Sequence, residues 1–131
     1  ATAGTQTSGL AWTNQADYAT DSESWNGSAW TATPSLNTAR IQDGGAGADN
    51  TSAISFGGYT TGFTAIANTE QWNGSAWSET NDLNATIGYQ FNGGSVTAAW
   101  SSAGRSNPGT IVNTTENWNS PTTSTVTFTV S

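Results

Sequence analysis

Three glutamates recur at the same place in a repeated motif, and they are the chain's main candidates for acid–base chemistry. Glu23, Glu70 and Glu116 each lie two residues before a tryptophan. Two carboxylates about 5 to 10 Å apart could cleave a polysaccharide. Alternatively, each carboxylate serves its repeat as an acceptor for a backbone amide or a turn. We favour this structural role, because equivalent positions of successive repeats are set apart in space.

The composition removes most other catalytic and metal-binding groups. The 131 residues include no His, Cys, Met or Lys, so the commonest general base, the commonest metal ligand and any thiolate are missing. We therefore expect no enzymatic activity and no cofactor. The net charge is −7, with Arg40 and Arg105 as the only cationic side chains. This balance argues against nucleic acids and anionic membranes as partners, and no apolar run reaches the roughly 20 residues that membrane insertion needs.

One glycine-rich segment has the pattern of a calcium site. Gly44-Gly-Ala-Gly47-Ala-Asp49 matches the start of the calcium-binding nonapeptide,. That motif acts in tandem copies, but here it occurs once, and Thr51 stands where a large apolar residue belongs. We therefore rank Asp49 as a calcium ligand below the alternative, a glycine-rich strand close to a neighbouring backbone, and expect no metal.

A tryptophan motif is written almost identically twice. Trp25-Asn-Gly-Ser-Ala-Trp30 is repeated as Trp72-Asn-Gly-Ser-Ala-Trp77, and a shortened copy occurs at Trp118. Asn-Gly between β-favouring residues predicts a hairpin with a two-residue type I′ turn. Such a turn would make Trp25 and Trp30 diagonal neighbours on one face of the hairpin.

The spacing of the aromatic residues predicts one domain, residues 1–131, made of three repeats. The first tryptophans of the three hairpin copies are 47 and 46 residues apart, whereas Trp12, Phe56 and Trp100 are 44 and 44 apart. We place the repeats at about 1–36, 37–83 and 84–131. The last repeat would end in an alternating strand at residues 125–130.

Each repeat is predicted to contain four short strands and no helix. The first strand is rich in glycine (41–48 and 87–94), the second ends at an aromatic residue, and the tryptophan hairpin supplies the third and fourth,. Strands with one large and one small face suit sheets that neighbours cover on both sides, as in the blades of a β-propeller. The core between sheets is then expected to contain the repeated aromatic residues: Trp12, Trp25, Trp30, Phe56, Trp72, Trp77, Trp100 and Trp118.

The middle repeat resembles a kelch repeat. A diglycine follows Phe56, and Trp72 and Trp77 take the places of the aromatic residues of the third and fourth strands. The chain is more similar still to tandem kelch-like repeats in proteins of marine bacteriophages and related bacteria. The resemblance implies an all-β propeller segment of about three four-stranded antiparallel blades. Propellers typically need four to eight blades, so upstream repeats or oligomerisation would have to close the ring.

Candidate binding residues lie in the loops between the second and third strands. We call Trp12, Phe56 and Trp100, which end the predicted second strands, the aromatic anchors. The distance from the anchor to the first tryptophan of the hairpin is 13, 16 and 18 residues in the three repeats. Variable loops on a rigid scaffold often carry binding residues. These loops contain Tyr18, Tyr59, Phe63 and Arg105, which have no repeated counterpart. The alternatives are that the loops are tolerated surface variation or contacts between subunits.

The kelch-like resemblance implies a structural or adhesion module of a phage virion appendage, such as a tail fibre or a surface-decoration protein. Its partners would be other copies of itself or other virion proteins, and the resemblance also allows a host-surface glycan bound by the loops. The alternative is a secreted bacterial glycan-binding or adhesin domain. Both hypotheses place the protein outside the cell, on a virion or as a secreted chain.

Overall fold

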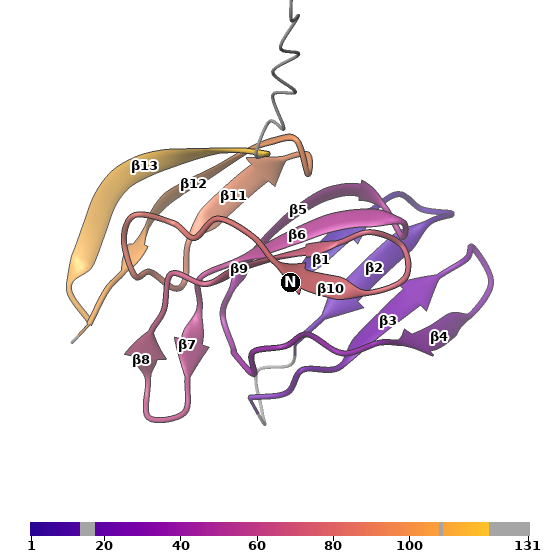
Figure 1. Ribbon diagram of the computed structural model, residues 1–131, viewed down its shortest axis with the longest axis horizontal. Helices are drawn as coiled ribbons and strands as arrows, with labels where there is room; N and C mark the ends of the chain where they lie inside the picture. The colour runs from indigo at the N-terminus through magenta and orange to yellow at the C-terminus, as the bar shows by residue number, and fades with distance from the viewer. Residues whose placement is uncertain (14–17, 108, 121–131) are drawn as a thin grey trace, which may run out of the picture.

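The computed structural model describes residues 1–13, 18–107 and 109–120, and this part of the chain is all β, as predicted. It forms three antiparallel sheets, one per repeat, and a small hairpin (Figure 1). The first sheet contains β1 (Thr2–Gly4), β2 (Gly9–Trp12), β3 (Ser22–Trp25) and β4 (Trp30–Thr33). The second contains β5 (Gly44–Asp49), β6 (Ser52–Phe56), β9 (Thr69–Trp72) and β10 (Trp77–Glu79). The third contains β11 (Phe91–Gly94), β12 (Ala98–Arg105) and β13 (Ile111–Asn119), and the hairpin is β7 (Tyr59–Thr60) with β8 (Thr64–Ala65).

Two of the predicted four-stranded sheets are therefore present, and the third has three strands within the described residues. The predicted closing strand at 125–130 lies outside them. In each four-stranded sheet the strands follow one another in the order in which the chain supplies them. The first strands also lie side by side, since β1 contacts β5 and β5 contacts β11. The three sheets therefore meet along their first strands.

The predicted two-residue turn in the tryptophan hairpin is wrong. Trp25 pairs directly with Trp30, and Trp72 with Trp77, so four residues form each loop. The Asn26 side-chain oxygen accepts hydrogen bonds from the amides of Ser28 and Ala29 at 2.9 and 3.0 Å. These bonds hold the loop closed in place of a tight backbone turn. Only Gly27 in this loop needs a positive φ, of 94°,.

The predicted position of Trp100 is also wrong, by two residues. Strand pairing places Gly9, Ala53 and Ala99 opposite the first tryptophan of their hairpins. Trp100 is therefore equivalent to Leu10 and Ile54, and Ser102 is the equivalent of the aromatic anchors. The repeat keeps the 46-residue period of the hairpins here, and the third loop then has the same 16-residue spacing as the second. Aligning Trp100 with Trp12 and Phe56 by residue type gives the wrong register, because Ser102 occupies the aromatic position in this repeat.

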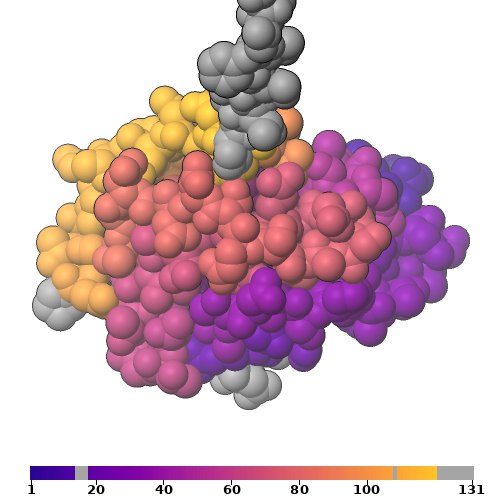
Figure 2. Space-filling model, viewed as in Figure 1, coloured from indigo at the N-terminus to yellow at the C-terminus, as the bar shows by residue number. Residues whose placement is uncertain are grey.

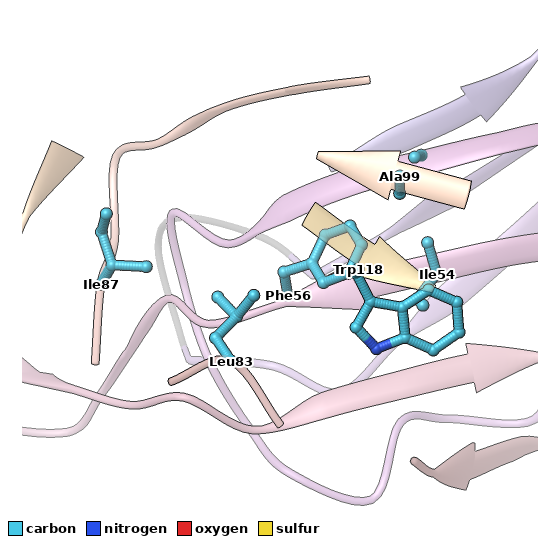
Figure 3. Close-up of a cluster of buried hydrophobic side chains, with 7 residues drawn as sticks. Ile54, Phe56, Leu83, Ile87, Ala99 and Trp118 are labelled. Atoms are coloured by element: carbon cyan, nitrogen blue, oxygen red, sulfur yellow. The ribbon is translucent and has the colours of Figure 1, made fainter. Parts of the chain in front are cut away.

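Two apolar clusters join the sheets. Between the first and second sheets, Trp12 packs on Trp77 with ring centroids 5.2 Å apart. Between the second and third sheets, Phe56 packs against Trp118 at 6.2 Å, with Ile54 and Leu83 in the same cluster (Figure 3). Each cluster combines residues of adjacent repeats, so neighbouring sheets provide one another's core.

Three of the predicted core aromatic residues lie outside these clusters. Trp30 and Trp100 are 51% and 42% exposed, and Trp25 is half-buried. Trp25 and Trp30 belong to the outer face of the first sheet, and Trp100 to the outer face of the third. Their repeat positions are those of the core, but no sheet among the described residues covers either outer face. The other predicted core aromatics, Trp12, Phe56, Trp72, Trp77 and Trp118, are buried.

Candidate functional site

The structure brings the candidate loop residues together. The ring of Phe63 lies 6.4 Å from that of Tyr18 and 6.1 Å from that of Tyr59. Tyr59 in turn lies 5.6 Å from Tyr89, and the Arg105 guanidinium lies 6.0 Å from the centre of the Tyr89 ring. We call Tyr18, Tyr59, Phe63, Tyr89 and Arg105 the loop aromatic cluster. It joins residues from four separate parts of the chain.

The β7–β8 hairpin carries the centre of this cluster. It projects away from the three sheets in Figure 1 and forms the lower left edge of the same view in Figure 2. Tyr59 begins the hairpin and pairs with Ile41 through an isolated β-bridge. The Asn107 side chain binds both backbone groups of Ala65, at 2.9 and 3.3 Å. The hairpin is therefore attached to the loop of the third sheet.

Tyr59 is the buried member that fixes the others. It is 3% exposed, and its hydroxyl donates a hydrogen bond of 2.8 Å to the carbonyl oxygen of Arg105. Its ring lies so close to Gly88 that a Cβ there would come within 2.2 Å of it, so no larger residue fits at that position. Burial raises the pKa of Tyr59, Tyr89 adds to the rise, and Arg105 opposes it.

The raised pKa predicts that Tyr59 makes the fold sensitive to alkali. The folded chain retains the phenolic proton at a pH where the unfolded chain releases it, so this contribution is complete at neutral pH and is lost above about pH 10. We expect Tyr59→Phe to lower the neutral stability by about 1 kcal/mol, because the Arg105 carbonyl loses its donor. Between neutral pH and about pH 11, the melting temperature of this variant should then fall less steeply with pH than that of the wild type. Equal pH slopes for the two proteins would contradict this assignment.

The backbone of the cluster is strained. Tyr18, Phe63 and Tyr89 have φ values of 48°, 58° and 56°, in the left-handed region that costs a residue with a side chain about 1 to 2 kcal/mol. Bulky residues rarely adopt it. Such strain persists where the surrounding contacts determine the conformation, and it gathers at binding and catalytic sites.

The cluster presents two aromatic rings and a cation to solvent. Phe63 and Tyr89 are 60% and 49% exposed. Arg105 is exposed and has no salt bridge within the described residues, whereas the other cation, Arg40, is paired with Glu70. An aromatic ring has a negative face that attracts polarised C–H groups, and a guanidinium binds carboxylates in a bidentate manner. The arrangement suits a ligand with an apolar C–H face and an anionic group.

Sequence reasoning missed Tyr89. The predicted glycine-rich strand covers residues 87–94, whereas β11 begins at Phe91, and the ring of Tyr89 before it packs against that of Tyr59. A comparison of repeats could have found it, because its equivalent 47 residues earlier is Gln42, which has a similar φ of 53°. An aromatic residue in place of an amide, at a site shared by two repeats, is a signal of local function.

The recurring glutamates fasten one repeat to the next. Glu70 accepts hydrogen bonds from the backbone amides of Asn37 and Thr38 at 2.7 and 3.0 Å. Glu116 accepts the corresponding bonds from Asn84 and Ala85, also at 2.7 and 3.0 Å. The structural alternative for these two carboxylates is thus the one observed. Glu23, by contrast, is exposed.

Asp49 has a local role in its own hairpin. Its Oδ1 atom accepts bonds from the amide and the hydroxyl of Thr51 at 2.8 and 2.6 Å. These bonds close the turn between β5 and β6, and both lower the pKa of Asp49. Across the described part of the chain, no group of three or more His, Cys, Asp or Glu side chains could hold a metal ion.

Neither a scan of protein-family models nor a search of curated proteins finds a match to this chain. Among the residues that the structure describes, no helix is long and apolar enough to cross a membrane.

Proposed function

We propose that this chain is a non-enzymatic adhesion module, built as a segment of a kelch-like β-propeller, whose loop aromatic cluster binds a glycan. The kelch-like resemblance points to a phage virion appendage that meets a host surface. A secreted bacterial adhesin is the alternative, and it would use the same site. Three successive antiparallel sheets that share cores across their interfaces support the propeller part of the proposal.

One observation carries the binding proposal: aromatic residues from separate loops converge on one exposed, strained cluster. Phe63 and Tyr89 come from separate loops, and both rings lie against the buried Tyr59 while remaining exposed to solvent. Core packing does not explain this arrangement. Exposed aromatic residues that gather on a rigid support are typical of recognition surfaces, because they offer contact area at little cost in side-chain entropy.

The composition of the cluster specifies the class of glycan. The rings of Phe63 and Tyr89 suit the C–H face of a pyranose. Arg105 is the cation next to them, in a chain whose net charge is −7. A sugar that carries a carboxylate would gain from this cation, and a neutral sugar would gain only the stacking. We therefore expect acidic glycans, such as uronic-acid polymers, to bind best.

Binding can be tested with an array of bacterial surface polysaccharides, followed by calorimetry with a soluble oligosaccharide from the best ligand. We expect Phe63→Ala and Tyr89→Ala to weaken binding about tenfold or more, as central interface residues do. Arg105→Gln should weaken binding of acidic glycans and leave neutral ones unchanged. Phe91→Ala is the matched control, because Phe91 is 72% exposed and lies outside the cluster.

Two results would contradict the proposal. If Trp30→Ala removed binding and Phe63→Ala did not, the exposed indoles of the first sheet would be the binding site. If the protein released reducing ends from the bound polysaccharide, it would be an enzyme.

A further inference from the structure

The described sheets pack through one interface that occurs twice. In each case an aliphatic residue of the second strand lies in the same cluster as an alanine of the next sheet. Leu10 of the first sheet is clustered with Ala53 of the second, and Ile54 of the second with Ala99 of the third. The large member always belongs to the earlier sheet, and the small member to the later one. The interface therefore has a direction along the chain.

The outer face of the first sheet is an unused copy of the later side of this interface. We call Gly9, Glu23, Trp25 and Trp30 the first end face. Strand pairing makes them equivalent to Ala53, Glu70, Trp72 and Trp77. Trp77 is 6% exposed beneath the first sheet, whereas Trp30 is 51% exposed. Glu23 is also exposed, and within the described residues its carboxylate has none of the amide partners that Glu70 has.

The outer face of the third sheet holds the earlier side's position with other residues, and no sheet among the described residues covers it. We call Phe91 and Trp100 the second end face, since pairing places both side chains on the face opposite Ala99. Trp100 is equivalent to Leu10 and Ile54, each at most 1% exposed, yet it is 42% exposed itself. Phe91 beside it is 72% exposed. Among the described residues, the three sheets are thus flanked by two apolar faces with opposite roles in the same interface.

The sizes of the residues on the two end faces match each other. Inside the chain the large and small partners are Leu with Ala and Ile with Ala. At the ends the corresponding pair is Trp100 with Gly9, the largest side chain with the smallest residue. Gly9 itself is buried, and a groove of about 550 Å³ runs beside it, bounded by Trp25 and Trp30 and by the first strands of the three sheets. The largest side chain at one end thus corresponds to the smallest residue at the other.

We propose that the second end face of one copy docks on the first end face of another copy, head to tail. The occupant is a second copy because the two faces repeat the two sides of an interface that this chain already makes with itself. Such a contact is heterologous, so it either closes into a ring or extends. Two copies would bring together six sheets, within the four to eight blades of a propeller. We therefore expect a two-copy ring.

The test is the mass of the full chain in solution, measured by sedimentation and light scattering. We expect a dimer for the wild type and a monomer for Trp30→Glu or Trp100→Glu alone. An equimolar mixture of the two variants should form a one-to-one complex, because each supplies the face that the other lacks. Phe63→Glu is the control: Phe63 is as exposed as these residues but lies in the loop aromatic cluster, so this variant should remain a dimer.

Gly9 offers a second, independent test. A Cβ at Gly9 would lie 3.6 to 3.7 Å from its nearest neighbours in the same chain, so Gly9→Ala should fold normally. Gly9→Leu should weaken the dimer more than Gly9→Ala, because it fills the space for Trp100. Circular dichroism of each variant checks that the fold is retained.

Two outcomes would overturn the head-to-tail contact, and a third would overturn only the closed ring. A wild type that stays monomeric at every concentration excludes the contact. A dimer that Trp100→Glu removes and Trp30→Glu leaves intact would mean that two second end faces pair with each other. Filaments that both variants abolish would support the head-to-tail contact without ring closure. None of these results depends on glycan binding, so the two proposals fail separately.

Discussion

Replacing Glu70 with Ala is expected to lower the free energy of unfolding by about 3 to 5 kcal/mol, because the change leaves a buried cation without its partner. The Arg40 side chain is fully buried, and its guanidinium contacts the Glu70 carboxylate directly. The same carboxylate accepts the amides of Asn37 and Thr38. One substitution therefore leaves the buried Arg40 charge uncompensated and removes the acceptor for two partly buried amide bonds.

Glu116 is the matched control for this prediction. It makes the same backbone bonds to the linker between the second and third sheets, but the position equivalent to Arg40 is Ile87, so no ion pair is present. Its bonds are also more exposed. We expect Glu116→Ala to cost about 1 kcal/mol. Denaturant unfolding followed by tryptophan fluorescence would measure both losses, and equal losses would show that the ion pair contributes nothing.

Replacing both members of the pair separates the charge from the amides. If the uncompensated Arg40 causes most of the loss, then Arg40→Met combined with Glu70→Gln should be more stable than Glu70→Gln alone. In a double-mutant cycle the two single losses should exceed the combined loss by about 1 kcal/mol or more. Additive losses would instead assign the effect to the backbone hydrogen bonds of Glu70.

Most strands could be predicted from the sequence, because a comparison of the three repeats shows which segments recur. Glycine-rich, alternating and tryptophan-containing segments recur in one order, and strands form in each kind of segment, although β5 and β11 begin three and four residues later than predicted. Register was less predictable, since it depends on which residues pair across strands and not on residue type. Residue type therefore matches Trp100 with Phe56, although strand pairing aligns it with Ile54. The predicted two-residue turn at Asn26 is wrong because the Asn26 side chain accepts the hydrogen bonds that the prediction assigned to the backbone.

The candidate site was predictable in its members but not in its shape. Tyr18, Tyr59, Phe63 and Arg105 could be chosen because their residue types do not recur along the sequence, although the isolated bridges make Tyr59 and Arg105 equivalent positions of two repeats. Nothing in the sequence showed that Tyr59 would be buried as a support while Phe63 stayed exposed. That difference arises from contacts between loops of different repeats, which linear spacing does not encode. Tyr89 was not predicted for the same reason, because it lies in a segment whose sequence pattern predicts a strand.

The second large effect is expected at the hairpin tryptophans, where the same substitution should cost different amounts in different repeats. Trp72 is 2% exposed and packs on Trp77 with ring centroids 5.7 Å apart. Trp72→Ala should therefore destabilise the fold by about 3 to 5 kcal/mol through lost burial and the cavity it leaves. Trp25 occupies the equivalent place in the first sheet but is only half-buried. For Trp25→Ala we expect about half that loss or less, because less apolar area returns to water.

The two positions form a matched pair because their polar contacts are alike. Each indole donates one hydrogen bond to a backbone carbonyl, Trp72 to Asn50 at 3.0 Å and Trp25 to Gln6 at 2.9 Å. Any difference in unfolding free energy then measures how completely a neighbouring sheet covers the ring. If a second copy covers the first sheet, the cost of Trp25→Ala should rise with protein concentration, and that of Trp72→Ala should change less. Equal costs at low concentration would mean that the first sheet needs no neighbour for its core.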